Sequence, residues 1–440
     1  MSDVDSISPE RRDEILDALR RGTVPAQSLD LLAVGLQGYE EALDHELTAA
    51  EAGRGVFKAV RGEYGSGKTF FARWLQERAL SRRFATTEVQ ISEAETPLHR
   101  LETVYRRLVE RLSVAGTRYG ALRLVVDGWF FTLEEDVLAE YPDLTDESEL
   151  LDRTTALMER KLEEVNRNAP AFAACLRAYR RALSEGEQGI ADGLLAWLGG
   201  QPNVAASTKR YAGIKGDIDH FGAMSFLQGL LIVLRDSGHP GLVWVLDEVE
   251  TLQRVRGDVR DKGLNALRQL MDEIDAGRFP GLYLLMTGTP PFFEGPQGVQ
   301  RLPPLAQRLH VDFQTEPRFD NPRAPQIRLQ NFDHARLLAV GEKVRDLFAA
   351  GAPAQERILA KVDDAYLEAL ATAVTGNLGG NVGIAPRLFL KKLVADILDR
   401  VDQFPDFEPR EHYALTVTHN ELTPQERAAA GTSSVDDIQL

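Results

Sequence analysis

Hydrophobic positions along this chain alternate between compact apolar runs and helical spacing. Four segments are predicted strands: 55–62 (GVFKAVRG), 85–92 (ATTEVQIS), 241–248 (GLVWVLDE) and 281–290 (GLYLLMTGTP), of which the last two contain continuous apolar runs. Strands that are apolar along their whole length are typical of parallel sheets, in which helices cover both faces. Between these runs apolar residues recur at helical spacing, as in 97–112 (PLHRLETVYRRLVERL). Strands that alternate with helices predict an α/β fold with a mainly parallel sheet.

Helical patterns also fill the longest stretches that carry no strand signal. Apolar residues keep near-helical spacing from about 145 to 200, and Asp146 with Glu149 resembles a capping box near the start of this stretch. After a proline-rich break at 317–325 (PRFDNPRAP), the chain reads as helical to about residue 402. The tail from 403 onward contains one possible strand and a polar end.

Composition and charge narrow the class of protein. Apolar residues make up 43% and charged residues 27% of the 440 residues, which is the balance of a globular protein of two or three units. The 51 Lys and Arg residues against 67 Asp and Glu residues give a formal charge of −16. An acidic surface argues against broad coating of nucleic acid, although a local basic groove stays possible.

Cysteine content and the apolar runs predict where the protein resides. Cys175 is the only cysteine, so we expect no disulfide within the chain, no cysteine-based metal site and a reducing compartment. The N-terminus, MSDVDSISPERRDEIL, is charged and lacks the apolar core of a signal peptide. The longest apolar runs, such as 226–234 (FLQGLLIVL), are about half as long as a bilayer span. We expect a soluble, cytoplasmic protein without membrane contact.

One motif carries most of the chemistry. The segment GEYGSGKT matches the P-loop pattern G-x-x-x-x-G-K-[ST] and lies between a predicted strand and a predicted helix, as that motif requires. Its glycines allow backbone N–H groups and the helix N-terminus to point at phosphates. Lys68 is expected to reach the β- and γ-phosphates of ATP, and the Thr69 hydroxyl to bind Mg²⁺. The predicted nucleotide-binding residues of the loop are Gly62, Glu63, Tyr64, Gly65, Ser66, Gly67, Lys68 and Thr69.

Two acidic positions compete for the metal-binding role. A hydrolysing P-loop enzyme needs one carboxylate at a strand end for the metal and a second acid to polarise the attacking water. Asp247 is followed directly by Glu248, whereas Asp127, in the run 122–131 (LRLVVDGWFF), is followed by Gly128. We assign Asp247 to Mg²⁺ and Glu248 to the role of general base. Asp127 is interpreted as a strand-end or turn residue.

Two further positions follow the next buried strand. Thr287 at the end of 281–290 is the first candidate to orient the attacking water, and Thr289 is the second; both can also simply cap a turn. Arg308 lies in a short predicted helix within 301–313 (RLPPLAQRLHVDF), before another strand. In oligomeric ATPases an arginine there can stabilise charge at a neighbour's γ-phosphate. Arg301 is the reserve candidate, and an ordinary exposed arginine is the alternative.

The stretch 375–392 (TGNLGGNVGIAPRLFLKK) places an arginine at the start of a helix. The order of strand, P-loop lysine, Asp-Glu pair, threonine and arginine resembles that of an AAA+ module, which ends in a small helical lid. This resemblance implies that Arg387 leans over the nucleotide, while Pro386 fixes the start of the helix. Four glycines would let the loop approach closely: Gly376, Gly379, Gly380 and Gly383.

Several longer segments point to a narrower family. The chain resembles the bacterial phage-defence ATPases of the BREX ATP-binding family, of the BrxD type, and more distantly the origin-recognition and transposition-helper ATPases. The resemblance lies in ALRRGTVPAQSLDLLAVG, VRGEYGSGKTFFARWLQERAL, ISEAETPLHRLETVYRRLVERL, WLGGQ and LVWVLDEVETLQR. It implies an accessory motor or regulator that accompanies a large helicase, with DNA as the ultimate target. The role considered for Arg308 further predicts a homo-oligomer, in which this arginine completes the site of a neighbouring subunit.

The spacing of the motifs departs from a minimal AAA+ core. Lys68 and Asp247 are separated by 247 − 68 = 179 positions, so we expect a helical insertion between them. Its basic residues and its aromatic run 129–131 are interpreted as solvated helix faces and core packing rather than DNA contacts. The expected division is 1–50, an N-terminal segment on the adenine side; 51–135 and 226–320, the two parts of the P-loop core; 136–225, the insertion; 321–402, the helical lid; and 403–440, the tail.

These observations predict a Mg²⁺-dependent ATP hydrolase of the AAA+ class that acts beside a helicase in phage defence. DNA would be met directly or through the partner. The main alternative is a nucleotide-gated scaffold that recruits the helicase with little turnover. Glu248 disfavours this alternative, because a protein that only binds ATP does not need a general base. A P-loop kinase or small-molecule transferase is disfavoured, because the sequence shows no separate acceptor site.

Overall fold

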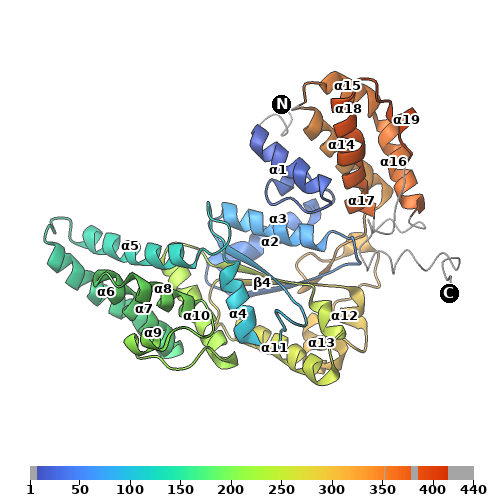
Figure 1. Ribbon diagram of the computed structural model, residues 1–440. Helices are drawn as coiled ribbons and strands as arrows, with labels where there is room; N and C mark the ends of the chain where they lie inside the picture. Colours follow the sequence, from blue (N-terminus) through green and yellow to red (C-terminus); the bar gives the residue numbers. More distant parts are fainter. Residues whose placement is uncertain (1–6, 351, 378–384, 415–440) are drawn as a thin grey trace.

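A five-stranded parallel sheet lies at the centre of the molecule (Figure 1). The computed structural model describes residues 7–350, 352–377 and 385–414. The strands follow the order β2-β3-β4-β1-β5, and every pairing is parallel. Their bounds are β1 (Val56–Arg61), β2 (Ala85–Gln90), β3 (Leu242–Asp247), β4 (Leu282–Gly288) and β5 (Gln326–Arg328). The predicted α/β class and the first four strands are confirmed, whereas β5 was missed because only three residues form it.

Helices cover both faces of the sheet, and β3 shows how the sequence arranges this. Val243 and Val245 pack in one hydrophobic cluster with α3, whereas Leu242, Trp244 and Leu246 pack in the cluster on the opposite face. Because side chains alternate along a strand, a continuous apolar run buries both faces. The first face carries α2 (Gln37–Glu51) and α3 (Lys68–Ser81), and the second carries α4 (Leu101–Glu110), α10 (His220–Asp236) and α11 (Gly257–Asp275).

Between β2 and β3 the chain forms a helical extension at one end of the sheet (Figure 1, left). It consists of α5 (Leu122–Glu140), α6 (Glu147–Asn168), α7 (Pro170–Ser184), α8 (Gln188–Leu198) and α9 (Ala206–Tyr211), and α10 leads back to the sheet. The Asp146 side chain accepts hydrogen bonds from the N–H groups of Ser148 and Glu149 at the start of α6. The predicted helical character of this region is therefore confirmed.

The interpretation of Asp127 as a strand-end residue is wrong. The run 122–131 belongs to α5, in which Val125, Val126, Trp129 and Phe130 are buried. An apolar run this short fits a buried strand and a buried helix equally well by pattern alone. Asp127 accepts a hydrogen bond of 2.7 Å from the Tyr179 hydroxyl inside the extension, far from a strand end.

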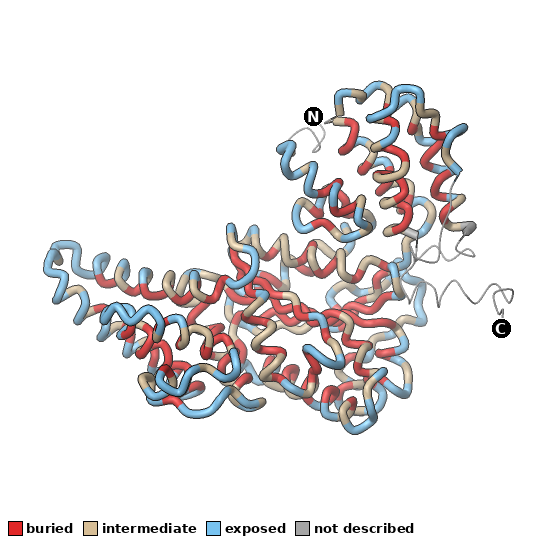
Figure 2. The backbone as a smooth tube through the Cα atoms, viewed as in Figure 1, coloured by how far each residue is buried: buried red, intermediate tan, exposed pale blue. Residues whose placement is uncertain are grey.

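The C-terminal helices form a bundle with a core of its own, visible as a separate buried region in Figure 2. The bundle contains α14 (His334–Ala349), α15 (Gln355–Lys361), α16 (Asp364–Asn377), α17 (Ala385–Lys391), the π-helix η7 (Lys392–Leu398) and α18 (Asp399–Gln403). The N-terminal helix α1 (Pro9–Arg20) packs into the same core through Ile15, Leu16 and Leu19. Arg20 donates two hydrogen bonds of 2.8 Å to Asp399, which ties the end of α1 to the start of α18.

Short helical turns link the larger elements. They are η2 (Leu29–Leu31), η3 (Val249–Gln253), α12 (Pro290–Glu294), η4 (Val299–Arg301), α13 (Pro303–Leu309), η5 (Pro317–Phe319) and α19 (Pro409–His412). Within the described ranges, none of the helices has both the length and the apolar character needed to cross a membrane. The loop glycines Gly379, Gly380 and Gly383 and the possible strand of the tail lie outside the described residues.

Candidate nucleotide-binding site

The P-loop lies at the edge of the sheet where the parallel strands end. It connects β1 to α3, which is the context that the motif requires. Gly65 (φ 77°) and Gly67 (φ 89°) take left-handed backbone conformations that favour glycine. A Cβ atom on Gly62 would lie 2.2 Å from the Ser66 hydroxyl oxygen. The tight turn of the loop therefore depends on three of its glycines.

Lys68 is held against the loop itself. Its Nζ atom donates hydrogen bonds to the carbonyl oxygens of Gly62 (2.8 Å) and Glu63 (3.0 Å). The same ammonium group lies 5.2 Å from the centre of the Tyr64 ring. Burial lowers the pKa of Lys68, and nearby carboxylates, first Glu250 and then Asp247, oppose that effect. The loop thus presents a buried cation where an anionic phosphate could replace the two carbonyl contacts.

Asp247, at the end of β3, is hydrogen-bonded to α3 and to β4. The Thr69 hydroxyl donates to its Oδ2 atom at 3.2 Å, and the Thr287 hydroxyl at the end of β4 donates a short hydrogen bond to its Oδ1 atom. Burial raises the pKa of Asp247, and the hydrogen bond from Thr287 opposes this shift. The carboxylate is therefore fixed in position by the P-loop helix on one side and by β4 on the other.

The donor set around Thr69 and Asp247 fits Mg²⁺. This ion takes oxygen ligands, keeps several waters and is usually bound by one or two carboxylates together with substrate phosphates. Thr69 and Asp247 offer a hydroxyl and a carboxylate oxygen 3.2 Å apart at the start of α3. Across the part of the chain that the structure describes, no cluster of three or more His, Cys, Asp or Glu residues could hold a metal alone. Phosphate oxygens and water would have to complete the coordination.

Two glutamates follow Asp247, and the sequence interpretation named only the first. Glu248 is half-buried and has a left-handed backbone (φ 58°), and its N–H group donates to Asp247 (3.1 Å) and Thr287 (3.3 Å). Glu250 is buried, and its Oε2 atom has no hydrogen-bond partner among the described residues. Burial raises the pKa of Glu250 to about 7, although Lys68 opposes this shift. In the sequence, Glu250 is distinguished only by its place two residues after Glu248.

These groups line one cavity of about 400 Å³. The P-loop from Tyr64 to Thr69, Asp247, Glu248 and Glu250 form its polar wall. The opposite wall is apolar and comes mainly from the N-terminal segment and from the residues after β5; it includes Leu19, Val24, Leu36, Phe332 and Val340. The N-terminal part was expected on the adenine side, whereas Phe332 and Val340 carried no signal in the sequence.

Arg387 lines the same cavity as the P-loop. It is the third residue of α17, directly after Pro386, which also lines the cavity. A Cβ atom on Gly22 would lie 3.3 Å from the Nη1 atom of Arg387, so the guanidinium group lies against the turn that follows α1. The structure therefore brings Arg387 and Lys68, 319 positions apart (387 − 68), to one site.

The remaining candidates lie elsewhere. Arg308 is in α13, where its Nη1 atom is 2.6 Å from Asp272 Oδ1, on α11. Arg301 pairs with Asp261 at 2.8 Å. Neither arginine lines the cavity of its own chain. Thr289 is buried at the start of α12 and makes no side-chain cap hydrogen bond.

Comparison with known proteins gives one match. The family described as BREX system ATP-binding protein BrxC/D matches residues 7–417, which is nearly the whole chain and includes every cavity-lining segment described above. No curated protein and no solved structure matches the chain.

Proposed function

Because the chain belongs to the family of BREX system ATP-binding proteins, with an ATP-binding role in phage defence, we propose that it is a Mg²⁺-dependent ATP hydrolase of the AAA+ class. It would work as an accessory motor or regulator beside a helicase that processes DNA, as proteins of the BrxD type are expected to do. The observation that carries this proposal is the linkage of Asp247 to both Thr69 and Thr287, with Glu248 beside it in the cavity of the P-loop.

Each residue of the site has a defined task in this proposal. Lys68 exchanges its carbonyl contacts for phosphate oxygens, and Thr69 and Asp247 would hold Mg²⁺, which neutralises phosphate charge when bound. Glu248 accepts the proton of the attacking water, and Thr287 keeps Asp247 and the Glu248 backbone in place. Arg387 contacts the γ-phosphate from the lid, so that nucleotide state can change the position of the C-terminal bundle.

The assembly proposed here is a homo-oligomer in which Arg308 of one copy completes the site of its neighbour. Its place outside the cavity of its own chain agrees with such a role. The ion pair with Asp272 would have to open when the neighbouring nucleotide recruits the guanidinium group. DNA would be reached directly or through the helicase.

Steady-state ATP hydrolysis with and without DNA separates the motor from the scaffold. We expect Glu248→Gln to bind ATP but to lose hydrolysis, because an amide cannot accept the proton of water. Glu163→Gln, at an exposed position of α6, is the matched control and should behave as the wild type. A wild type that hydrolyses ATP no faster than Glu248→Gln under every condition would leave only the scaffold.

A further inference from the structure

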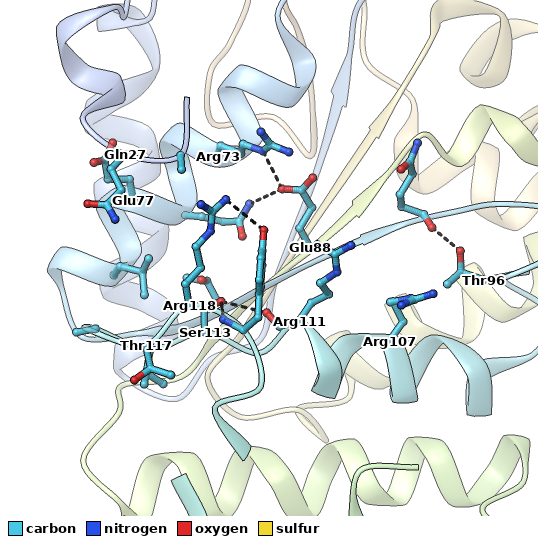
Figure 3. Close-up of a pocket in the computed structure, with 18 of the residues that line it drawn as sticks. Gln27, Arg73, Glu77, Glu88, Thr96, Arg107, Arg111, Ser113, Thr117 and Arg118 are labelled. Atoms are coloured by element: carbon cyan, nitrogen blue, oxygen red, sulfur yellow. Dashed lines mark hydrogen bonds and ion pairs between the residues drawn. The ribbon is translucent and has the colours of Figure 1, made fainter. Parts of the chain in front are cut away.

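A second, larger cavity of about 1020 Å³ lies beside the outer edge of β2. Figure 3 shows Arg73, Glu88, Arg107, Arg111 and Arg118 gathered around it. We call it the β2-edge groove and define it by Arg73, Glu88, Gln90, Arg107, Arg111 and Arg118. None of the residues assigned above to nucleotide or metal binding lines this groove.

The groove exposes main-chain groups of an edge strand. Ala85 N–H and Ile91 N–H donate to carbonyl oxygens next to or within β3 (3.0 and 2.9 Å). Odd-numbered residues of β2 therefore pair inward, and the even-numbered ones point outward, because alternate residues of a strand pair to opposite sides. Thr86 uses its outward groups in an antiparallel bridge to Ser113, with two hydrogen bonds of 2.8 Å.

The outward pairing stops at that bridge. Arg111 would be the next residue opposite Glu88, but it already follows the end of α4, so the chain turns away. In the described residues, neither backbone group of Glu88 nor the N–H group of Gln90 has a hydrogen-bond partner. An edge strand with open donors and acceptors is a template for another extended chain.

Four arginines and four glutamates line the groove, and two of the arginines have no acidic partner among the described residues. Arg73 pairs with Glu88 (3.3 Å) and Arg107 with Glu110 (2.9 Å). The guanidinium groups of Arg111 and Arg118 instead lie over the Tyr119 ring, 4.9 and 5.0 Å from its centre. Neither makes an ion pair with a carboxylate in the described parts of the chain. Arg111 and Arg118 can therefore bind carboxylates of a partner without first breaking an ion pair.

We propose that the β2-edge groove binds an extended, acidic peptide segment of another protein, which adds to β2 as a sixth strand. Its main chain would pair with Glu88 and Gln90, and its carboxylates would bind Arg111 and Arg118. Because Thr86 is already paired, the open part of β2 runs from 87 to 90 and accommodates a segment of about four residues. A nucleic acid strand fits less well, because its backbone offers no N–H and C=O groups that could pair with Glu88 and Gln90.

The groove adjoins the nucleotide cavity through one short segment. Val24 and Pro25 line the nucleotide cavity, and the next two residues, Ala26 and Gln27, line the groove. Arg73, on the helix that begins with Lys68, donates a hydrogen bond of 3.1 Å to the Val24 carbonyl oxygen. A bound peptide would therefore change the wall of the nucleotide cavity, and by linkage ATP would change peptide affinity by the same factor.

Fluorescence anisotropy with labelled peptides tests the groove on the full chain, without any need for ATP hydrolysis. The probes are an octapeptide of alternating Val and Glu, its Val-Lys counterpart and oligothymidylate. We expect the Val-Glu peptide to bind and the Val-Lys peptide not to bind. Arg111→Ala with Arg118→Ala should weaken binding at least about tenfold.

Main-chain pairing is tested by a matched pair of substitutions. Gln90→Pro removes an outward N–H group and no bond to β3, whereas Gln90→Ala keeps that group. We expect Gln90→Pro to lower the affinity for the Val-Glu peptide about tenfold. Gln90→Ala should keep that affinity within about twofold of the wild type. Unchanged thermal unfolding and ATP binding of both variants establish that the fold is intact.

Equal affinity of the two variants, no binding of the Val-Glu peptide, or preference for oligothymidylate would each overturn the proposal. ATP hydrolysis lost without loss of peptide binding would count against the proposed function alone.

Discussion

At the scale of single residues, Asp247 is the point through which the candidate site is ordered. Its two carboxylate oxygens accept hydrogen bonds from Thr69 and Thr287, and its neighbour Glu248 donates its N–H group to the same cluster. The left-handed backbone of Glu248 costs energy for a residue with a side chain, and such strain persists only where the surroundings impose it. The geometry of the proposed base therefore depends on residues that do not touch the substrate.

Thr287→Val tests this dependence. The substitution keeps shape but removes the hydroxyl that donates to Asp247 and accepts from Glu248 N–H, so we expect the free energy of unfolding to fall by about 1–2 kcal/mol. We also expect turnover to drop at least about tenfold with ATP affinity little changed. Thr289→Val, at another buried threonine, is the control. Equal turnover of the two variants would remove the positioning role of Thr287.

Glu250 predicts a dependence of stability on pH. Its pKa rises from the ordinary 4.5 to about 7 in the folded chain because of burial, so the folded state binds this proton more tightly than the unfolded state. The resulting stabilisation is complete below pH 4.5 and is lost as the pH rises through about 7. A difference of about 2.5 between the pKa values in the folded and unfolded chain corresponds to about 3 kcal/mol of folding stability.

Urea unfolding without nucleotide at pH 5 and pH 8 measures this effect. The wild type should lose more stability between the two values than Glu250→Gln, whose amide stays neutral. Glu163→Gln, at an exposed site, should keep the wild-type difference. Identical pH dependence in the wild type and Glu250→Gln would contradict the assignment.

At the scale of elements, α17 links the nucleotide cavity to the C-terminal bundle. Arg387 in its first turn lines the cavity, whereas Leu388 and Phe389 are buried in the core of the bundle. We expect Arg387→Ala to weaken ATP binding about tenfold without change in thermal unfolding. Arg410→Ala, on α19 of the same bundle, is the control. Unchanged ATP affinity and turnover in Arg387→Ala would show that this arginine does not act on the nucleotide.

Element prediction succeeded where pattern and local chemistry agreed. The strand that ends in Asp247 is a continuous apolar run, and the loop glycines mark the turn between β1 and α3. The run 122–131 failed because a helix buried on several sides reads like a strand over ten residues. The short β5 was missed because its register depends on pairing with β1, not on its own composition.

At the scale of the whole molecule, the cavity lies between the sheet edge and the C-terminal bundle. The wall formed by α1 and the following turn could not be predicted in detail, because its position depends on contacts such as Arg20 with Asp399, 379 positions apart. Glu250 was missed for a related reason. Its burial against the P-loop results from tertiary packing, and a second glutamate after a strand is by pattern an ordinary polar residue.

The proposed oligomer predicts complementation between two inactive variants. Arg308→Ala and Glu248→Gln should each bind ATP and fail to hydrolyse it. A mixture should recover part of the activity, because an intact Arg308 from one copy can then serve an intact Glu248 in its neighbour. Arg301→Ala, which removes the other arginine with an ion pair in its own chain, is the control and should remain active. Light scattering that shows a monomer with ATP, together with no recovery in the mixture, would exclude the role in trans.

Single-turnover hydrolysis of radiolabelled ATP by an excess of the protein tests the central claim most directly, because it separates the chemical step from product release and from unidentified partners. We predict phosphate formation by the wild type with Mg²⁺ and none with a chelator. The rate should be at least about 100-fold lower for Glu248→Gln, at equal ATP occupancy. Equal rates for the two proteins, or no phosphate from the wild type above the blank, would contradict this claim.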